Sequence, residues 1–168
     1  MEGLLPKLHG EEAVEIPGAR ALLDSLVSAN ASWAIVTSGT NALVTGWLDK
    51  LKLSPPDHLV TAESVEEGKP DPACYRLSRE KLRLGADARV VVFEDSPAGI
   101  QAGRTAGCKV IGLVTTHTLE QVLAAKPDWV LQDLRSVKMV GSVAGLVTLQ
   151  ISNALTQVGP GGINSLAQ

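Results

Sequence analysis

Apolar positions along this chain follow two patterns, and the two patterns alternate. Short continuous apolar runs bounded by turn residues predict strands that are buried on both faces; they cover residues 33–36, 58–65, 90–93 and 109–116. Apolar residues at helical spacing predict helices; they cover residues 19–30, 41–51, 73–84, 97–106 and 119–125. The alternation predicts an α/β fold, a parallel sheet flanked by helices, with functional residues at the carboxyl ends of the strands.

The pattern changes near the end of the sequence. Two β-type runs, 137–140 and 146–151, flank a segment rich in Gly, Ser and Ala, which predicts a C-terminal β-hairpin. A chain of 168 residues fits a single domain with a proper core. We therefore expect one core domain over residues 1–152 and a flexible, Gly-rich tail over residues 153–168.

Composition narrows the range of partners. The chain has 15 Lys and Arg against 18 Asp and Glu, with no basic cluster, which argues against a nucleic-acid partner. It has no apolar run long enough to span a bilayer and no signal-peptide pattern at its start. Cys74 and Cys108 lie far apart without metal-type spacing, which favours reduced thiols. We expect a cytoplasmic protein that acts on a small molecule.

Two adjacent carboxylates, Glu94 and Asp95, follow the apolar run at 90–93. Ionised carboxylates side by side repel one another and lose hydration, so a cation, a helix N-terminus or a shared proton normally compensates them. Asp95 also suits a helix cap, because a helix is predicted to begin near Pro97. As a pair, the two acids offer the oxygen ligands that Mg²⁺ prefers.

Other loops that follow predicted strands carry complementary groups. The turn Thr37-Ser38-Gly39-Thr40 places hydroxyls and backbone N–H groups before a helix, a geometry suited to phosphate. Lys69 lies between Gly68 and Pro70, and the prolines of this loop can direct its ammonium group into a cleft, although a loop lysine is commonly just solvated. His117 follows the run at 109–116 and can line the same cleft.

Three segments together resemble the haloacid dehalogenase (HAD) superfamily, and within it the fungal glycerol-3-phosphate and 2-deoxyglucose-6-phosphate phosphatases. VTSGT is similar to the family's second motif, GKPDP to its third and VVVFEDSPAGIQAG to its fourth. The resemblance implies a Rossmann-like HAD core. It also implies that Thr37, with the backbone near Ser38, holds a phosphate oxygen, that Lys69 neutralises phosphate, and that Asp95 with Glu94 holds Mg²⁺.

The family's first motif, Asp-x-Asp-Gly-Thr, does not occur in this sequence, and neither does the cap domain that usually follows it. That motif carries the aspartate nucleophile, whereas the only aspartate before Thr37 is Asp24, inside a helical pattern. Because an aspartyl-phosphate route needs this carboxylate, we expect the chain not to be a competent phosphatase. The resemblance also places the first strand at the centre of the sheet, so a truncated core exposes strand edges and favours a homo-oligomer.

Three functions fit these observations. The first is a non-phosphatase acid catalyst that opens an epoxide, or rearranges or cyclises a small metabolite, as an isomerase or cyclase does. It requires no cofactor, because repulsion between Glu94 and Asp95 keeps one of them protonated as a general acid. The alternatives are a degenerate Mg²⁺-dependent phosphatase of small phosphorylated metabolites or a binder of phosphate ligands, and a non-catalytic interaction module.

Overall fold

The structure is a computed structural model that describes residues 4–159 and 162–164. Six α-helices lie in this part of the chain: α1 (Leu5–Leu8), α2 (Ala19–Ser28), α3 (Asn41–Leu51), α4 (Ala73–Lys81), α5 (Pro97–Thr105) and α6 (Leu119–Ala124). Short 3-10 helices are η2 (Ala62–Ser64) and η3 (Leu134–Ser136). The strands are β1 (Ile35–Val36), β2 (Leu59–Val60), β3 (Val91–Glu94), β4 (Lys109–Leu113), β5 (Trp129–Leu131), β6 (Val137–Val143), β7 (Leu146–Ile151), β8 (Thr156–Gly159) and β9 (Gly162–Asn164).

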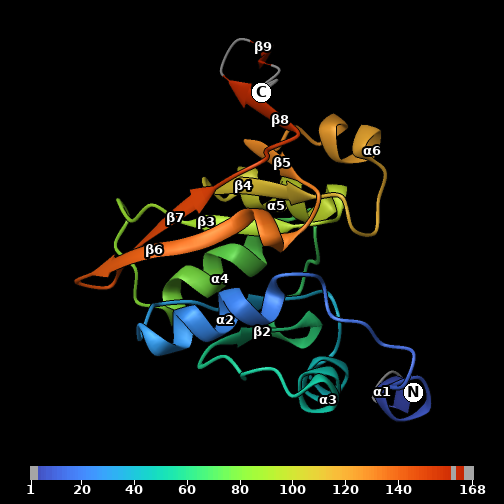
Figure 1. Ribbon diagram of the computed structural model, residues 1–168. Coiled ribbons are helices and arrows are strands. Elements are labelled where there is room, and N and C mark those ends of the chain that lie inside the picture. Colours follow the sequence, from blue (N-terminus) through green and yellow to red (C-terminus); the bar gives the residue numbers. More distant parts are fainter. Residues whose placement is uncertain (1–3, 160–161, 165–168) are drawn as a thin grey trace.

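The strands form three separate sheets (Figure 1). The largest has the order β3-β4-β5-β8-β9, in which β3, β4 and β5 are parallel and β8 and β9 are antiparallel additions at one edge. A second, two-stranded parallel sheet pairs β1 with β2. The third is the antiparallel hairpin of β6 and β7. The predicted α/β class, with helices flanking parallel strands and a C-terminal hairpin, is therefore confirmed.

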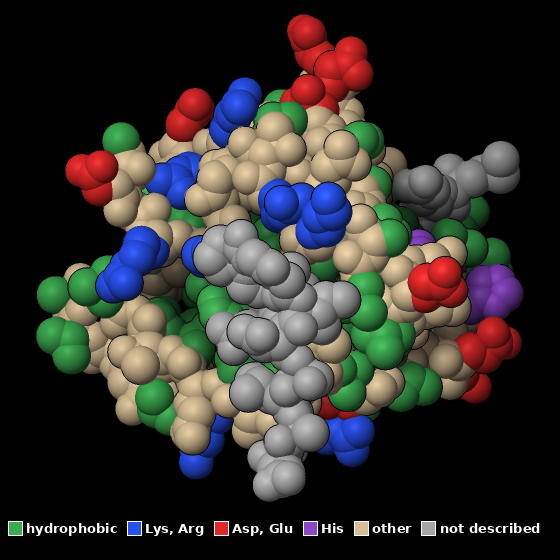
Figure 2. Space-filling model, turned by 90° about the horizontal axis from the view of Figure 1, so that it is seen from above, with side chains coloured by type: hydrophobic (Ala, Val, Ile, Leu, Met, Phe, Trp, Pro, Cys, Tyr) green, Lys and Arg blue, Asp and Glu red, His purple; other side chains and the backbone are tan. Residues whose placement is uncertain are grey.

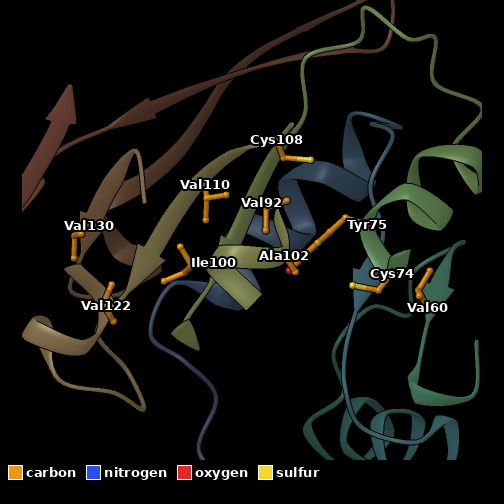
Figure 3. Close-up of a cluster of buried hydrophobic side chains, with 10 residues drawn as sticks. All are labelled: Val60, Cys74, Tyr75, Val92, Ile100, Ala102, Cys108, Val110, Val122 and Val130. Atoms are coloured by element: carbon orange, nitrogen blue, oxygen red, sulfur yellow. The ribbon is translucent and has the colours of Figure 1, made fainter. Parts of the chain in front are cut away.

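Both faces of the β3-β4-β5 sheet are buried, as the continuous apolar runs predict. Consecutive side chains of a strand point to opposite faces. On one face Val92, Val110 and Val130 pack with residues of α4, α5 and α6 (Figure 3). On the other face Ile111 and Leu131 pack with residues of α2 and of the hairpin. The two apolar clusters fix the helices around the β3-β4-β5 sheet.

Local capping sets where the helices near the site begin. The Ser96 hydroxyl accepts a hydrogen bond from the Gly99 amide at 3.0 Å, and Pro97 occupies the first position of α5. The Thr40 hydroxyl accepts from the Leu43 amide at 3.3 Å at the start of α3. Such caps satisfy amide groups that lack partners within the helix. The turns after β3 and β1 are thereby held in defined positions.

The edges of β1 and β3 fit the prediction of a missing central strand. Within the described residues β1 pairs only with β2, and β3 pairs only with β4. The described part of the tail does not fill this position, because β8 pairs with the far strand β5. Residues 160–161 and 165–168 of the expected tail lie outside the described residues, so its flexibility and the domain boundary stay predictions.

Several elements differ from the sequence expectations. The sequence pattern did not predict strand β5, because the apolar run Trp129–Leu131 is only three residues long. Strand β2 is two residues long instead of spanning 58–65, since Thr61 caps η2, which begins at Ala62. Among the described residues, no helix combines the length and the apolar character needed to cross a membrane.

Candidate functional site

A cavity of about 410 Å³ opens at the carboxyl ends of β1 and β3. It is lined by residues from both sheets and from the loops around them: Ile16, Val36, Thr37, Ser38, Gly39, Lys69, Phe93, Glu94, Asp95, Ser96, Leu113 and Thr115. The predicted hydroxyl loop, lysine and acid pair therefore meet in one place. The expected position of the site, at the ends of parallel strands, agrees with this cavity.

Lys69 joins the two parallel sheets. Its side chain is only 9% exposed, and its ammonium group donates to the Val36 carbonyl at 3.2 Å and to Oε1 of Glu94. The ammonium nitrogen also lies 5.3 Å from the centre of the Tyr75 ring, within the range of a cation–π interaction. Lys69 is thus held at the cavity wall by β1, β3 and α4 together, and a surface role for it is excluded.

Glu94 is buried at the wall of the cavity, and its carboxylate accepts hydrogen bonds from several donors. Its side chain is 7% exposed. The Tyr75 hydroxyl donates to Oε1 at 2.6 Å, and the Ser96 hydroxyl donates to Oε2 at 3.1 Å. Burial raises the pKa of Tyr75, and the Glu94 charge raises it further, so this phenol stays a donor. The Glu94 carboxylate therefore balances and orients Lys69.

Gly99 makes room for this carboxylate at the first turn of α5. A Cβ atom added at Gly99 would lie less than 3.0 Å from Cδ and both oxygens of Glu94. The absence of a side chain at Gly99 therefore lets Glu94 lie directly against the helix. The partial positive charge of a helix N-terminus favours an anion at such a position.

Asp95 faces a different environment from Glu94. Its carboxylate is half-buried, lines the cavity, and accepts a hydrogen bond from the Thr116 hydroxyl at 2.6 Å on Oδ2. Neighbours in an extended chain point to opposite sides, which separates the two acids despite their adjacency. Each of the two carboxylates therefore has its own hydrogen-bond donors, although the residues are adjacent in the sequence.

The turn after β1 presents a hydroxyl and an amide. Thr37 is half-buried, and its Oγ1 accepts from the Gly39 amide at 3.0 Å, which leaves its own proton available to the cavity. The Ser38 amide has no hydrogen-bond partner among residues 4–159 and 162–164. Thr37 and Ser38 can therefore donate to an oxyanion in the cavity.

Two predicted site residues do not line the cavity. Thr40 serves as the cap of α3, which turns its hydroxyl to the helix amides. His117 is half-buried, and its Nδ1 lies 2.9 Å from the Thr116 hydroxyl oxygen, so the imidazole contacts the site through Thr116. Sequence reasoning missed Tyr75, Thr116 and Thr115. Only the position of Thr115 and Thr116 after a predicted strand could have indicated them.

A divalent cation fits this site through one protein ligand. In the described part of the chain no three His, Cys, Asp or Glu side chains group to hold a metal. Mg²⁺, however, commonly uses one or two carboxylates together with waters and substrate phosphate oxygens. Asp95 suits this role, because Oδ1 is not engaged by the Thr116 hydrogen bond and the side chain lines the cavity. Both oxygens of Glu94 are already used.

Residues 5–113 match the profile of a family described as haloacid dehalogenase-like hydrolase. The chain is 37% identical over 146 residues to glycerol-1-phosphate phosphohydrolase 1 of Saccharomyces cerevisiae, covering 83% of this chain and 58% of that protein. It is 39% identical over 129 residues to hexitol phosphatase A of Escherichia coli, covering 69% of this chain and 59% of that protein. The chain therefore spans less than two thirds of the length of either relative.

Solved structures agree with the fold. A hydrolase from Pseudomonas syringae matches with a TM-score of 0.70 and 27% identity, covering 79% of this chain and 61% of that one. CbbY from Rhodobacter sphaeroides in complex with phosphate matches with a TM-score of 0.65 and 26% identity, covering 78% of this chain and 58% of that one.

These relatives overturn the predicted function. Proteins at 37% and 39% identity are named as phosphatases, so the interpretation as a non-phosphatase acid catalyst of the isomerase or cyclase type is wrong. The physical reason lies in the site, where Lys69 and Thr116 each stabilise one carboxylate as an acceptor. Because the family profile covers well over half of the sequence, the chain belongs to the haloacid dehalogenase-like hydrolase family.

Proposed function

We propose that this chain forms the phosphate-binding and Mg²⁺-binding part of a phosphatase site for small phosphorylated polyols or sugars. The observation that carries the proposal is the buried Lys69, which ends in the same cavity as Thr37, Ser38 and Asp95. An ammonium group, a hydroxyl and a free amide are three donors that suit one phosphate group. The substrate class rests on relatives named for glycerol phosphate and hexitol.

Each group has a distinct task in this proposal. The Thr37 hydroxyl and the Ser38 amide orient the phosphate by donating to its oxygens, and Lys69 neutralises its charge. Glu94, held by Tyr75 and Ser96, keeps the ammonium group in position. Asp95 provides a ligand for Mg²⁺, which when bound would stabilise negative charge on the phosphate oxygens.

An aspartyl-phosphate route also needs an aspartate that attacks the phosphorus atom of the substrate. These 168 residues contain no Asp-x-Asp sequence. The two carboxylates that line the cavity, Glu94 and Asp95, already serve Lys69 and the proposed cation. Hydrolysis through an aspartyl-phosphate therefore requires an aspartate from outside these residues.

β1 and β3 each have one edge without a partner strand among the residues that the structure describes, and these edges support association of the chain with itself. Unpaired strand edges offer rows of donors and acceptors to another chain. Basic and acidic side chains are interspersed on the face of the molecule in Figure 2, which favours a small-molecule ligand over nucleic acid. We accordingly propose a homo-oligomer of the cytoplasm whose cavity takes a small phosphorylated ligand.

Phosphate binding tests the proposal directly. Calorimetric titration with inorganic phosphate in the presence of Mg²⁺ should detect binding to the wild-type chain. Lys69→Met and Thr37→Val should each weaken it by tenfold or more, because each removes a donor from the cavity. Lys109→Met is the matched control, since Lys109 is exposed and pairs with Asp128 away from the cavity. No binding by the wild type, or equal binding by Lys69→Met and wild type, would contradict the proposal.

A further inference from the structure

We propose that Thr116 and His117 are positioning residues, which orient Asp95 through a chain of hydrogen bonds. The Thr116 hydroxyl donates to Oδ2 of Asp95 at 2.6 Å, and Nδ1 of His117 lies 2.9 Å from the same hydroxyl oxygen. The inference rests on the proposed function where it treats Asp95 as the Mg²⁺ ligand. The hydrogen-bond chain itself is independent of that function.

The protons that each group carries determine which group donates in each of these two hydrogen bonds. A threonine hydroxyl has one proton, and an ionised carboxylate has none to give. Since the Thr116 proton lies toward Asp95, the Thr116 oxygen can only accept from His117. The neutral imidazole must therefore carry its proton on Nδ1 and leave Nε2 as an acceptor.

The loop that carries both residues is anchored at its two ends. Before them, the Val114 amide donates to the Leu131 carbonyl at 3.0 Å. After them, Thr118 caps α6 by a reciprocal pair of hydrogen bonds with Gln121. Thr116 thus reaches Asp95 from the loop after the neighbouring strand β4, and hydrogen bonds anchor this loop on both sides of Thr116 and His117.

The hydrogen bond from Thr116 to Oδ2 of Asp95 affects how Oδ1 of the same carboxylate can bind a cation. With Oδ2 engaged by Thr116, rotation of the Asp95 carboxylate is restricted and Oδ1 is left for a cation in the cavity. Partners that hydrogen-bond a metal ligand in this way typically change metal affinity 10- to 100-fold when they are removed. We therefore expect Thr116 to act on Mg²⁺ affinity without touching the ion.

Imidazole ¹⁵N NMR of the whole chain tests the hydrogen-bond chain. The spectrum is recorded at about pH 8.5, well above the ordinary pKa of an imidazole, which is about 6.5. His117 should have its proton on Nδ1, and Thr116→Val should remove that preference while Thr116→Ser restores it. His58, which lies near the start of β2, serves as the internal control and should not change. An Nε2–H tautomer of His117 in the wild type would overturn the inference.

Calorimetry with Mg²⁺ alone tests the consequence for Asp95. Thr116→Val should bind Mg²⁺ about tenfold more weakly than wild type, and Thr116→Ser should bind nearly as well as wild type. Equal affinity of Thr116→Val and wild type would overturn the inference and leave the proposed function standing. Absence of Mg²⁺ binding in the wild type would overturn the role of Asp95 as a Mg²⁺ ligand and, with it, the effect of Thr116 on Mg²⁺ affinity. The phosphate titration would still test the role of Lys69 separately.

Discussion

Replacing Gly99 with alanine should destabilise this protein, although the same change inside a helix usually stabilises it by about 0.5–1 kcal/mol. The reason is the Glu94 carboxylate, whose three terminal atoms would all lie within 3.0 Å of the new methyl group. The carboxylate would have to retreat from the helix. Its hydrogen bonds with Lys69, Tyr75 and Ser96 would then lengthen together.

The size of the effect follows from these bonds. Hydrogen bonds to a charged group contribute about 1.5–3 kcal/mol each, and overpacking alone costs about 1–3 kcal/mol. Because the bonds are weakened rather than removed, and the helix gains slightly, we expect the free energy of unfolding to fall by about 2–3 kcal/mol. Urea unfolding followed by circular dichroism and tryptophan fluorescence measures this difference.

Two controls isolate the cause. Gly103→Ala changes a second glycine of α5, where the new Cβ would lie 3.0 Å from a methyl group of Val110, so its cost should be smaller. In a Glu94→Ala background the carboxylate is gone, and Gly99→Ala should then stabilise by up to about 1 kcal/mol. If Gly99→Ala destabilises equally with and without Glu94, or is as stable as wild type, the clash is not the cause.

Other predictions concern the same buried groups and the strand edges. Lys69→Met should lower the free energy of unfolding by about 3 kcal/mol, because it leaves the Glu94 charge without its ion partner, and adding Glu94→Gln should recover much of the loss; denaturant unfolding of both variants measures this. Stability should be full below about pH 9 and fall as pH rises further, because burial raises the pKa of Cys74, Cys108 and Tyr75 in the folded state while the unfolded groups ionise. Each such group adds a slope of about 1.4 kcal/mol per pH unit, so a Cys74→Ala/Cys108→Ala variant that kept the wild-type slope in alkaline thermal melts would contradict the assignment. Sedimentation should detect a homodimer that forms through the edges of β1 and β3, and a compact monomer at all concentrations would count against it. The chain by itself should not hydrolyse glycerol phosphate; Mg²⁺-dependent release of phosphate that disappears in Asp95→Asn would refute this.

Local sequence determined the order and type of most elements. The helical spacing at 41–51 corresponds to α3, and the apolar run at 90–93 overlaps β3. These features depend on a residue's neighbours in the chain, because periodicity decides which face is apolar and capping residues decide where helices begin. The residue types Thr37, Lys69 and Asp95 at or near the ends of such elements also indicated side chains that line one cavity in the structure.

Tertiary structure alone decided what each residue of the candidate site contacts. Lys69 and Glu94 are 25 positions apart, Tyr75 and Glu94 are 19 apart, and Thr116 and Asp95 are 21 apart. No local pattern records such contacts, since they arise when α4, β3 and the loop after β4 pack together. For this reason the sequence suggested two competing acids, whereas the fold gives each acid its own donor. The short strand β5 and the pairing of β8 with it likewise depend on the sheet that is already present.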